Sequence, residues 1–275
     1  MVFKPKVKAP NPQLIQTTTK ILQQNHTITV CEASACPNRA ECYMQKSATF
    51  MILGDVCTRA CRFCNIKTGK PKYYDSNEAN NIANAVYELG LDYVVITSVD
   101  RDDLDDLGCS AFLKTVMAIK HKNPNTKIEL LTPDFQANKS VLRQIVSCGA
   151  YKLAHNQETV RRLSPKIRPQ SDYEISLKTL RYYSKYFSGD IKSSLMIGLG
   201  ERESEIIETM YDLLDVGVTQ LTIGQYLQPT AKHYKVYRYY SNDYFKKLKD
   251  IALSIGFKSV ASGILVRSSY YAKNL

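Results

Sequence analysis

Apolar residues repeat at intervals of three and four in four segments of the chain, and each segment ends at a glycine that precedes a short apolar run. This period is typical of an amphipathic helix, and glycine directly after it is typical of a helix C-terminus. The four pairs are Gly90 before 93–96, Gly149 before 151–154, Gly217 before 221–223 and Gly256 before 259–260. Further strands are predicted at 49–53, 128–131 and 194–197.

Strands that alternate with helices of this length predict right-handed βαβ units and a parallel sheet. The number of units, six or seven, indicates a barrel or a partial barrel. In such a fold, functional side chains gather at the carboxyl ends of the strands. Polar segments that follow predicted strands are 97–104, 155–156, 198–201 and 225–229.

The composition is that of a globular protein. The chain has 275 residues, of which 44% are hydrophobic, and a net charge of +11 from 37 basic and 26 acidic residues. No apolar run approaches the roughly 18 residues of a membrane span, and the N-terminal residues lack the apolar core of a secretory signal. We therefore expect a cytoplasmic protein of bacterial type, or the mature form of an organelle protein.

Cysteine is the most informative residue type. Six of the eight cysteines form two triplets, 31-36-42 and 57-61-64. Because nothing indicates secretion, clustered cysteines point to metal or redox chemistry. Three thiolates per site suit an iron–sulfur cluster, while a zinc site completed by histidine is the alternative. The remaining two, Cys109 and Cys148, fall on apolar helix faces and are predicted to pack in the core.

The second triplet resembles a family signature. Cys57-x3-Cys61-x-Phe63-Cys64 is similar to the CxxxCxΦC motif of the radical S-adenosylmethionine (SAM) superfamily. The resemblance implies that these three cysteines bind a [4Fe–4S] cluster whose open iron chelates SAM. It also implies reductive cleavage of SAM to methionine and a 5′-deoxyadenosyl radical.

Two further motifs narrow the resemblance to lipoyl synthases. Cys31-x4-Cys36-x5-Cys42 resembles their auxiliary-cluster motif, and Arg267-Ser268-Ser269-Tyr270 resembles their RSSY motif. Segments 99–104, 195–201 and 224–229 are also similar to lipoyl synthase segments. The resemblance implies an α/β fold, a partial (β/α)6-type TIM barrel of the radical SAM kind over 46–260. An N-terminal extension, 1–45, and a C-terminal segment, 261–275, would carry the auxiliary cluster.

The implied activity is that of a sulfurtransferase. Two sulfur atoms enter a protein-bound octanoyl-lysine at C6 and C8, and two molecules of SAM are used for each lipoyl group. The auxiliary [4Fe–4S] cluster, held by the first triplet and Ser269, would donate the sulfur and be consumed. The catalytic residues implied are Ser269, Cys57, Cys61 and Cys64.

The resemblance and the strand-end positions together predict the SAM contacts, with Phe63 in the cysteine loop. Asn156 suits the ribose hydroxyls, and Gly198 and Gly200 suit a close backbone approach. Arg168 suits the methionine carboxylate, or else it is a solvated loop residue. Two further segments have alternative roles. Glu201 either contacts a ligand or caps the next helix. The acidic run 100–106 is interpreted as a solvated helix start, despite its similarity to the family.

The implied partners are proteins. They are octanoylated lipoyl carrier domains (2-oxoacid dehydrogenase E2 subunits and the glycine-cleavage H protein), a low-potential donor such as ferredoxin or flavodoxin, and an iron–sulfur carrier protein. The +11 charge would steer an acidic carrier. Segment 233–240 mixes basic and aromatic residues, which favours carrier docking or a structural loop over RNA binding. No nucleic acid or membrane partner is expected.

Three other functions share part of this pattern. A tRNA methylthiotransferase shares the chemistry but carries additional N- and C-terminal domains. Biotin synthase shares the superfamily but lacks the combination of upstream triplet and RSSY motif. A zinc-stabilised nucleic-acid-binding module would contain zinc without iron or sulfide, so that metal content separates it from the enzyme.

Overall fold

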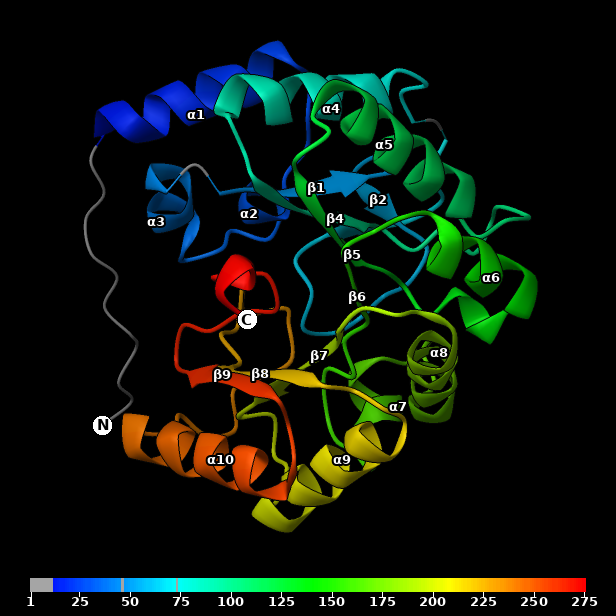
Figure 1. Ribbon diagram of the computed structural model, residues 1–275. Helices are drawn as coiled ribbons and strands as arrows, with labels where there is room; N and C mark the ends of the chain where they lie inside the picture. Colours follow the sequence, from blue (N-terminus) through cyan, green and yellow to red (C-terminus); the bar gives the residue numbers. More distant parts are fainter. Residues whose placement is uncertain (1–11, 46, 73) are drawn as a thin grey trace. The chain divides into compact units, whose positions relative to one another are not determined.

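The computed structural model of the protein describes residues 12–45, 47–72 and 74–275 (Figure 1). These residues divide into two compact units. The N-terminal unit comprises 12–59 and 65–152, without residues 46 and 73, and the C-terminal unit comprises 60–64 and 153–275. The first eleven residues of the expected N-terminal extension lie outside the described residues.

The N-terminal unit is built on three parallel strands. β1 (Thr49–Ile52) pairs with β4 (Tyr93–Ser98), and β4 pairs with β5 (Lys127–Leu131). The long helices α4 (Glu78–Leu89) and α5 (Cys109–Lys122) contact each other beside these strands (Figure 1). Their shared apolar faces explain the contact, because the side chains buried there include Ile82, Val86, Phe112 and Val116.

Shorter elements complete this unit. Helix α1 contacts both α3 and α4, and α2 contacts β1. The strands β2 and β3 form a separate parallel pair. The bounds are α1 (Pro12–Gln24), α2 (Val30–Ala33), α3 (Arg39–Met44), β2 (Val56–Cys57), β3 (Lys67–Thr68), η1 (Phe135–Ala137) and α6 (Lys139–Ser147).

Parallel strands in chain order also form the sheet of the C-terminal unit. They are β6 (Lys152–Ala154), whose last two residues pair with β7 (Ile191–Ile197), then β8 (Gln220–Gln225) and β9 (Ser259–Gly263). Helix α10 packs along β9, and α8 contacts both β7 and α9. The helices are α7 (Ser164–Ile167), α8 (Tyr173–Tyr186), α9 (Glu203–Asp215), α10 (Asn242–Ile255) and η2 (Ala272–Asn274).

Strand–helix alternation in both units confirms the predicted α/β class with parallel sheets. The predicted glycine stops are also confirmed: Gly90 caps α4 with a φ of 64°, a left-handed conformation that glycine adopts without strain, and the other three glycines also have positive φ. Strand β7 begins at Ile191, three residues before the predicted start. The earlier start was not predicted because Lys192 is charged, which is typical of a loop, although its side chain is fully buried in the strand.

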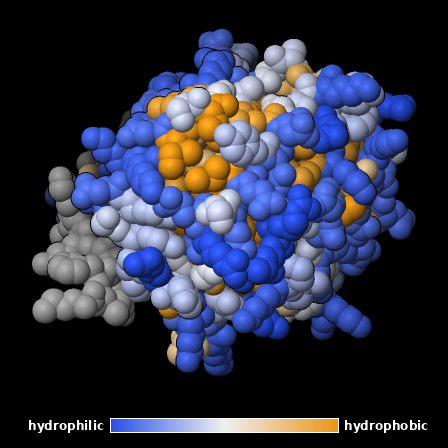
Figure 2. Space-filling view, turned by 90° about the horizontal axis from the view of Figure 1, so that it is seen from below, coloured by the Kyte–Doolittle hydropathy of each residue, from blue (hydrophilic) through white to orange (hydrophobic). Residues whose placement is uncertain are grey.

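The surface is mostly polar on the face shown in Figure 2, where apolar residues gather in one area. Of the two core cysteines that we predicted, Cys109 is buried, whereas Cys148 follows α6 as its C-cap and is only half-buried. Among the described helices, none is both long enough and apolar enough to cross a membrane.

Candidate active site

Cys57 ends the short strand β2 in the N-terminal unit, at a point where backbone N–H groups converge on its sulfur. Its Sγ accepts hydrogen bonds from the N–H groups of Arg59 (3.4 Å) and Asp100 (3.3 Å), and it lies 3.7 Å from Oδ2 of Asp100. Asp100 follows β4, so the sulfur of Cys57 lies at the carboxyl end of that strand. N–H···S bonds of this kind stabilise a thiolate and tune a metal centre bound to it.

Arg59, between the first two cysteines of the second triplet, has a buried side chain that pairs with three carboxylates; that of Asp134 is buried, and those of Asp100 and Asp102 are partly exposed. Its guanidinium pairs with Asp102 through Nε (2.7 Å) and Nη2 (2.8 Å), and with Asp134 through Nη1 (2.6 Å) and Nη2 (2.8 Å). Nη1 also lies 3.4 Å from Asp100. The carboxylates follow two different strands, β4 and β5, so that one side chain ties the cysteine loop to both strand ends.

Burial makes the ion pair between Arg59 and Asp134 costly to break. The side chains of Arg59 and Asp134 are 4% and 2% exposed, where an unpaired charge would be strongly disfavoured. Burial by itself raises the pKa of Asp102, but hydrogen bonds from Arg59 and Gln136 and the positive charge of Arg59 together outweigh burial, and the pKa falls below its ordinary value. The interpretation of 100–106 as a solvated helix start is wrong for Asp100 and Asp102 in one respect: Asp102 is exposed, but both carboxylates pair with Arg59 instead of starting a helix. It holds for Asp106, which accepts N–H bonds at the start of α5.

The segment with Cys61 and Cys64 belongs to the C-terminal unit and is braced by that unit's loops. The N–H of Cys64 donates to the carbonyl of Cys61 (3.0 Å), and the N–H of Arg62 donates to the carbonyl of Ile167 (2.9 Å). The ring of His233 lies 3.0 Å, through Nε2, from the carbonyl oxygen of Cys64. The backbone around both cysteines is thus fixed by segments far away in the sequence.

The first triplet lies in the N-terminal unit on two short helices. Cys31 is on α2, whose N-cap is Thr29, and Cys42 is on α3. The N–H of Cys36 donates to the carbonyl of Cys31 (3.1 Å). Asn65, the residue after Cys64, donates through Nδ2 to the carbonyl of Ala33 (3.2 Å), which links α2 to the chain beyond the second triplet.

The thiols of the first triplet affect one another electrostatically. Burial raises the pKa of Cys31 to about 11 and that of Cys42 to about 12, and repulsion from Cys31 and Cys36 adds to the increase at Cys42. All eight cysteines are thiols and none forms a disulfide. The three residues therefore share one neighbourhood, in which binding of a cation would have to remove protons.

The RSSY segment lies after β9 in the C-terminal unit. Arg267 donates through Nη1 to the carbonyl of Val266 (2.6 Å), and Tyr270 donates its N–H to the carbonyl of Arg267 (3.0 Å), which makes a turn around Ser268 and Ser269. Gly224 on β8 permits this approach, because a Cβ there would lie 2.1 Å from the carbonyl oxygen of Val266. Ser269 itself is half-buried.

The turn after β7 is organised by Glu201. Its carboxylate accepts the N–H groups of Gly198 (2.6 Å) and Leu199 (2.8 Å), whereas α9 is capped by Glu205. Of the two alternatives for Glu201, the helix cap is therefore not the one that the structure shows. A Cβ on Gly198 would lie 2.2 Å from Nε2 of Gln225, so packing inside the chain by itself requires glycine there. Whether Gly198 and Gly200 also approach SAM stays a prediction.

Asn156 and Arg168 occupy different environments in the C-terminal unit. Asn156 donates through Nδ2 to Glu158 (3.0 Å), while its buried Oδ1 accepts no hydrogen bond from the described residues. Arg168 is 6% exposed and donates through Nη1 to the carbonyl of Gln157 (3.2 Å), so it is not the solvated loop residue of the alternative reading. Burial raises the pKa of Glu158, and Arg168 counteracts this increase.

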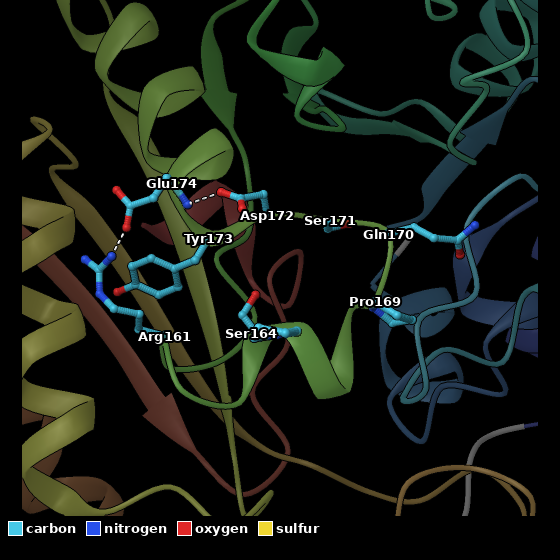
Figure 3. Close-up of a pocket in the computed structure, with 9 residues that line it drawn as sticks. Arg161, Ser164, Pro169, Gln170, Ser171, Asp172, Tyr173 and Glu174 are labelled. Carbon is cyan, nitrogen blue, oxygen red and sulfur yellow. Dashed lines mark hydrogen bonds and ion pairs between the residues drawn. The ribbon is translucent and has the colours of Figure 1, made fainter.

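A pocket of about 550 Å³ lies in the same unit and is lined by residues from 161 to 174 (Figure 3). Figure 3 shows Arg161 turned towards Glu174 at one side and Gln170 at the other. Gln170 accepts the N–H of Ala60, and thereby connects the pocket wall to the segment of Cys61 and Cys64. The buried hydroxyl of Ser164 is without a hydrogen-bond partner among the described residues. Hydroxyl, amide and ionic groups make up about half of the lining, and apolar surface makes up the rest.

Comparisons with known proteins agree with the motifs. A sequence profile of the radical SAM superfamily matches residues 51–213. The "Lipoyl synthase" of Halalkalibacterium halodurans is 50% identical over 270 residues, which cover 97% of this chain and 89% of that protein. The "Lipoyl synthase, mitochondrial" of Nematostella vectensis is 44% identical, with 98% and 92% covered. The chain belongs to the lipoyl synthase family.

Solved structures support the superfamily fold. A crystal structure of methylornithine synthase (PylB) has a TM-score of 0.59 at 14% identity and covers 96% of this chain and 82% of its own. A crystal structure of HydG, a maturase of the [FeFe]-hydrogenase, has a TM-score of 0.62 at 13% identity, with 90% and 70% covered. At this identity the likeness concerns the fold, which is the α/β partial barrel of radical SAM enzymes.

Membership of the lipoyl synthase family implies SAM and a [4Fe–4S] cluster, and the residues present fit both. Thiols with N–H donors at Cys57 suit iron, and the unsatisfied Oδ1 of Asn156 suits a hydroxyl donor. Among the described residues, no three side chains of His, Cys, Asp or Glu are already grouped as a metal site.

Sequence reasoning missed two side chains of this candidate site. Arg59 appeared only as a residue between cysteines, and its partners lie 43 and 75 positions away. His233 appeared only within a basic and aromatic run, although its partner is the carbonyl of Cys64. A signal was present for Arg59, because an arginine inside the cysteine loop and an excess of aspartates after β4 together favour an ion pair.

Proposed function

We propose that the chain inserts two sulfur atoms into an octanoyl group attached to a lysine of a carrier domain, at C6 and C8, and so completes a lipoyl cofactor. One observation supports the proposal most strongly. This chain, which is related to lipoyl synthases, has a second cysteine triplet besides the radical SAM triplet, and the thiols of that second triplet lie close enough to affect one another electrostatically. A site that only generated radicals would need no such second set of thiolates.

In this proposal Cys57, Cys61 and Cys64 hold the cluster that works with SAM. When bound, that cluster supplies one electron that splits SAM into methionine and a 5′-deoxyadenosyl radical, which can remove hydrogen from an unactivated C–H bond. The chain's own part is to hold the thiolates and exclude water. The N–H groups of Arg59 and Asp100 stabilise the Cys57 sulfur, and His233 fixes the backbone at Cys64.

SAM contacts are proposed at strand ends of the C-terminal unit. The buried Oδ1 of Asn156 is an acceptor for a ribose hydroxyl. Arg168 uses Nη1 internally, and its remaining N–H groups would pair with the methionine carboxylate. Gly198 and Gly200 would leave room for the backbone to approach SAM, and Phe63 would pack beside it.

The second cluster is proposed as the sulfur-donating substrate. Cys31, Cys36 and Cys42 would bind it, and Ser269 would be the fourth ligand, so that 1–45 and 261–275 carry this site and 46–260 carries the SAM site. Oxygen is a harder and less well-matched donor to iron than thiolate, which lets a serine ligand leave when sulfur is consumed. The turn around Ser269 is compatible with this role, because its backbone is fixed by Arg267 and Tyr270.

The proposed partners follow from the reaction. Octanoylated carrier domains, either E2 subunits or the H protein, supply the substrate. A low-potential donor such as ferredoxin or flavodoxin supplies electrons, and an iron–sulfur carrier protein rebuilds the consumed cluster.

An anaerobic assay tests the function. Reconstituted protein is first analysed for iron, sulfide and zinc, then incubated with SAM, dithionite and an octanoylated carrier domain. We expect iron and sulfide, a carrier that gains two sulfur atoms and loses two hydrogen atoms, and 5′-deoxyadenosine. Deoxyadenosine without sulfur on the carrier would contradict the proposed substrate, and zinc without iron would contradict the enzyme.

A further inference from the structure

The loop after β8 presents an exposed set of basic and aromatic side chains, which we name the β8 ridge: Lys232, Lys235, Tyr237 and Arg238. All four are exposed, and Tyr237, at 78%, exposes an unusually large part of an aromatic side chain. Because this loop follows the carboxyl end of a parallel strand, it lies on the side of the C-terminal unit where such folds place their active sites.

The backbone of the β8 ridge is fixed at both ends by the site itself. At one end, the N–H of Tyr234 donates to the carbonyl of Arg62 (2.9 Å), and His233 contacts the carbonyl of Cys64. At the other end, the N–H of Tyr237 donates to the carbonyl of Gly198 (2.8 Å), and Gln225 donates through Nε2 to the carbonyl of Arg238 (3.0 Å). The ridge is therefore preorganised beside the cysteine loop and the turn after β7.

The charges of the β8 ridge are not neutralised. Among the described residues, no carboxylate lies within ion-pair distance of Lys232, Lys235 or Arg238, whereas the exposed Lys247 and Lys258 of the same unit pair with Glu203 and Asp190. The ring of Tyr237 packs against Gly200, where a Cβ would lie 3.6 Å from it. A rigid exposed tyrosine among uncompensated cations is typical of a protein-binding surface that favours an acidic partner.

We propose that the β8 ridge is the docking surface for the acylated carrier, a protein with acidic side chains around its modified lysine. This inference rests on the proposed function, which requires a carrier to bring its lysine to the strand ends of this unit. The fixed attachment to the Cys64 and Gly198 segments means that a carrier bound here is next to the proposed cluster and SAM residues. Tyr237 supplies the contact area, and the three cations supply orientation and rate of encounter.

The first experiment measures binding without turnover. Titration of the protein with a fluorescent octanoylated carrier domain gives a Kd at low and high salt. For the variant Lys232→Glu/Lys235→Glu/Arg238→Glu we expect a Kd at least about tenfold weaker, and a smaller dependence on salt. The matched control Lys178→Glu/Lys246→Glu/Lys249→Glu changes charge equally at exposed positions on α8 and α10, and we expect it to bind within about twofold of the unmodified protein.

A second measurement uses turnover with dithionite, so that no protein electron donor takes part. We expect the ridge variant to show a raised KM for the carrier, with a smaller change in kcat. Equal Kd and KM in ridge and control variants would overturn the proposal, as would a defect that appears only when flavodoxin replaces dithionite, because that would assign the ridge to the electron donor. Binding by the unmodified protein without product would instead contradict the proposed function and leave the docking result intact.

Discussion

Cys31 and Cys42 lie on short helices, where Cys31 is buried and Cys42 half-buried, whereas Cys57 ends a two-residue strand beside four charged side chains. At the first triplet, the surroundings consist of short helices and local turns, and burial keeps the thiols of Cys31 and Cys42 protonated. Around Cys57, the chain supplies long-range ion pairs and two N–H donors to the sulfur. The difference matches the proposed division of labour, since a permanent cluster needs a fixed loop and a consumed cluster needs a site that can be emptied and refilled.

The largest expected effect separates the two triplets by chemistry. Cys57→Ala should lower SAM cleavage by at least about 10³-fold, because it removes a ligand of the SAM cluster. Cys31→Ala should retain SAM cleavage and abolish sulfur insertion. Deoxyadenosine and carrier mass are measured in the same reaction. An equal loss of deoxyadenosine in both variants would contradict separate roles for the two triplets.

A large effect on folding is expected from the charge network. Asp134→Asn removes one partner of a buried guanidinium, and should lower the free energy of unfolding of the apoprotein by about 3–5 kcal/mol. The matched control Asp215→Asn breaks the exposed pair with Arg181 and should change it by less than about 1 kcal/mol. Urea denaturation measures both. Similar losses in the two variants would show that the network does not hold the loop.

Arg59→Lys tests the paired hydrogen bonds that the guanidinium donates to Asp102 and Asp134. Lysine keeps the charge but cannot pair with two carboxylates in bidentate fashion, so SAM cleavage should fall about 10–100-fold. The electron paramagnetic resonance spectrum of the reduced cluster should also change, which a purely structural loss would not produce. Arg181→Lys is the matched control on an exposed pair. An unaltered spectrum with normal activity would count against the role of Arg59.

Ser269→Cys tests the weak ligand of the first site. A thiolate should hold the auxiliary cluster more firmly, so iron content should be kept while sulfur insertion slows about tenfold. Single-turnover lipoyl formation measures the rate, and Ser268→Cys is the neighbouring control. If Ser269→Cys inserts sulfur at the original rate, release of the serine is not a slow part of the reaction.

The smallest effect concerns the protons of the first triplet. The pKa of Cys42 is raised by burial from 9.0 to about 12, so its thiolate fraction should increase about tenfold per pH unit well above pH 9. Because the folded pKa is raised, the neutral thiol stabilises the apoprotein at neutral pH, and this contribution is lost as the pH rises from about 9 to about 12. Alkylation of Cys42 followed by mass spectrometry gives the profile. A rate that levels off near pH 9 would contradict it.

The apolar period and the glycines predicted most of the helices and the strands that follow them. Burial of one helix face leaves a period in the sequence, and a left-handed helix end favours glycine, so both signals are local. The start of β7 was missed because Lys192 is polar in sequence but buried in the fold. Cysteine spacing predicted candidate ligands, since ligation by neighbouring residues is local. The bonds of Arg59 to Asp102 and Asp134 were not predictable in detail, because they depend on which strand ends the fold brings together.

In the proposed reaction, the first triplet holds the cluster that supplies the sulfur, and the second triplet holds the cluster that generates the radical. The apoprotein is reconstituted with iron and sulfide enriched in a heavy sulfur isotope, and then given unlabelled SAM, dithionite and the octanoylated carrier. The account predicts a carrier that gains two heavy sulfur atoms, and no labelled product from a Cys31→Ala variant that still forms deoxyadenosine. A lipoyl group that contains only light sulfur would contradict it.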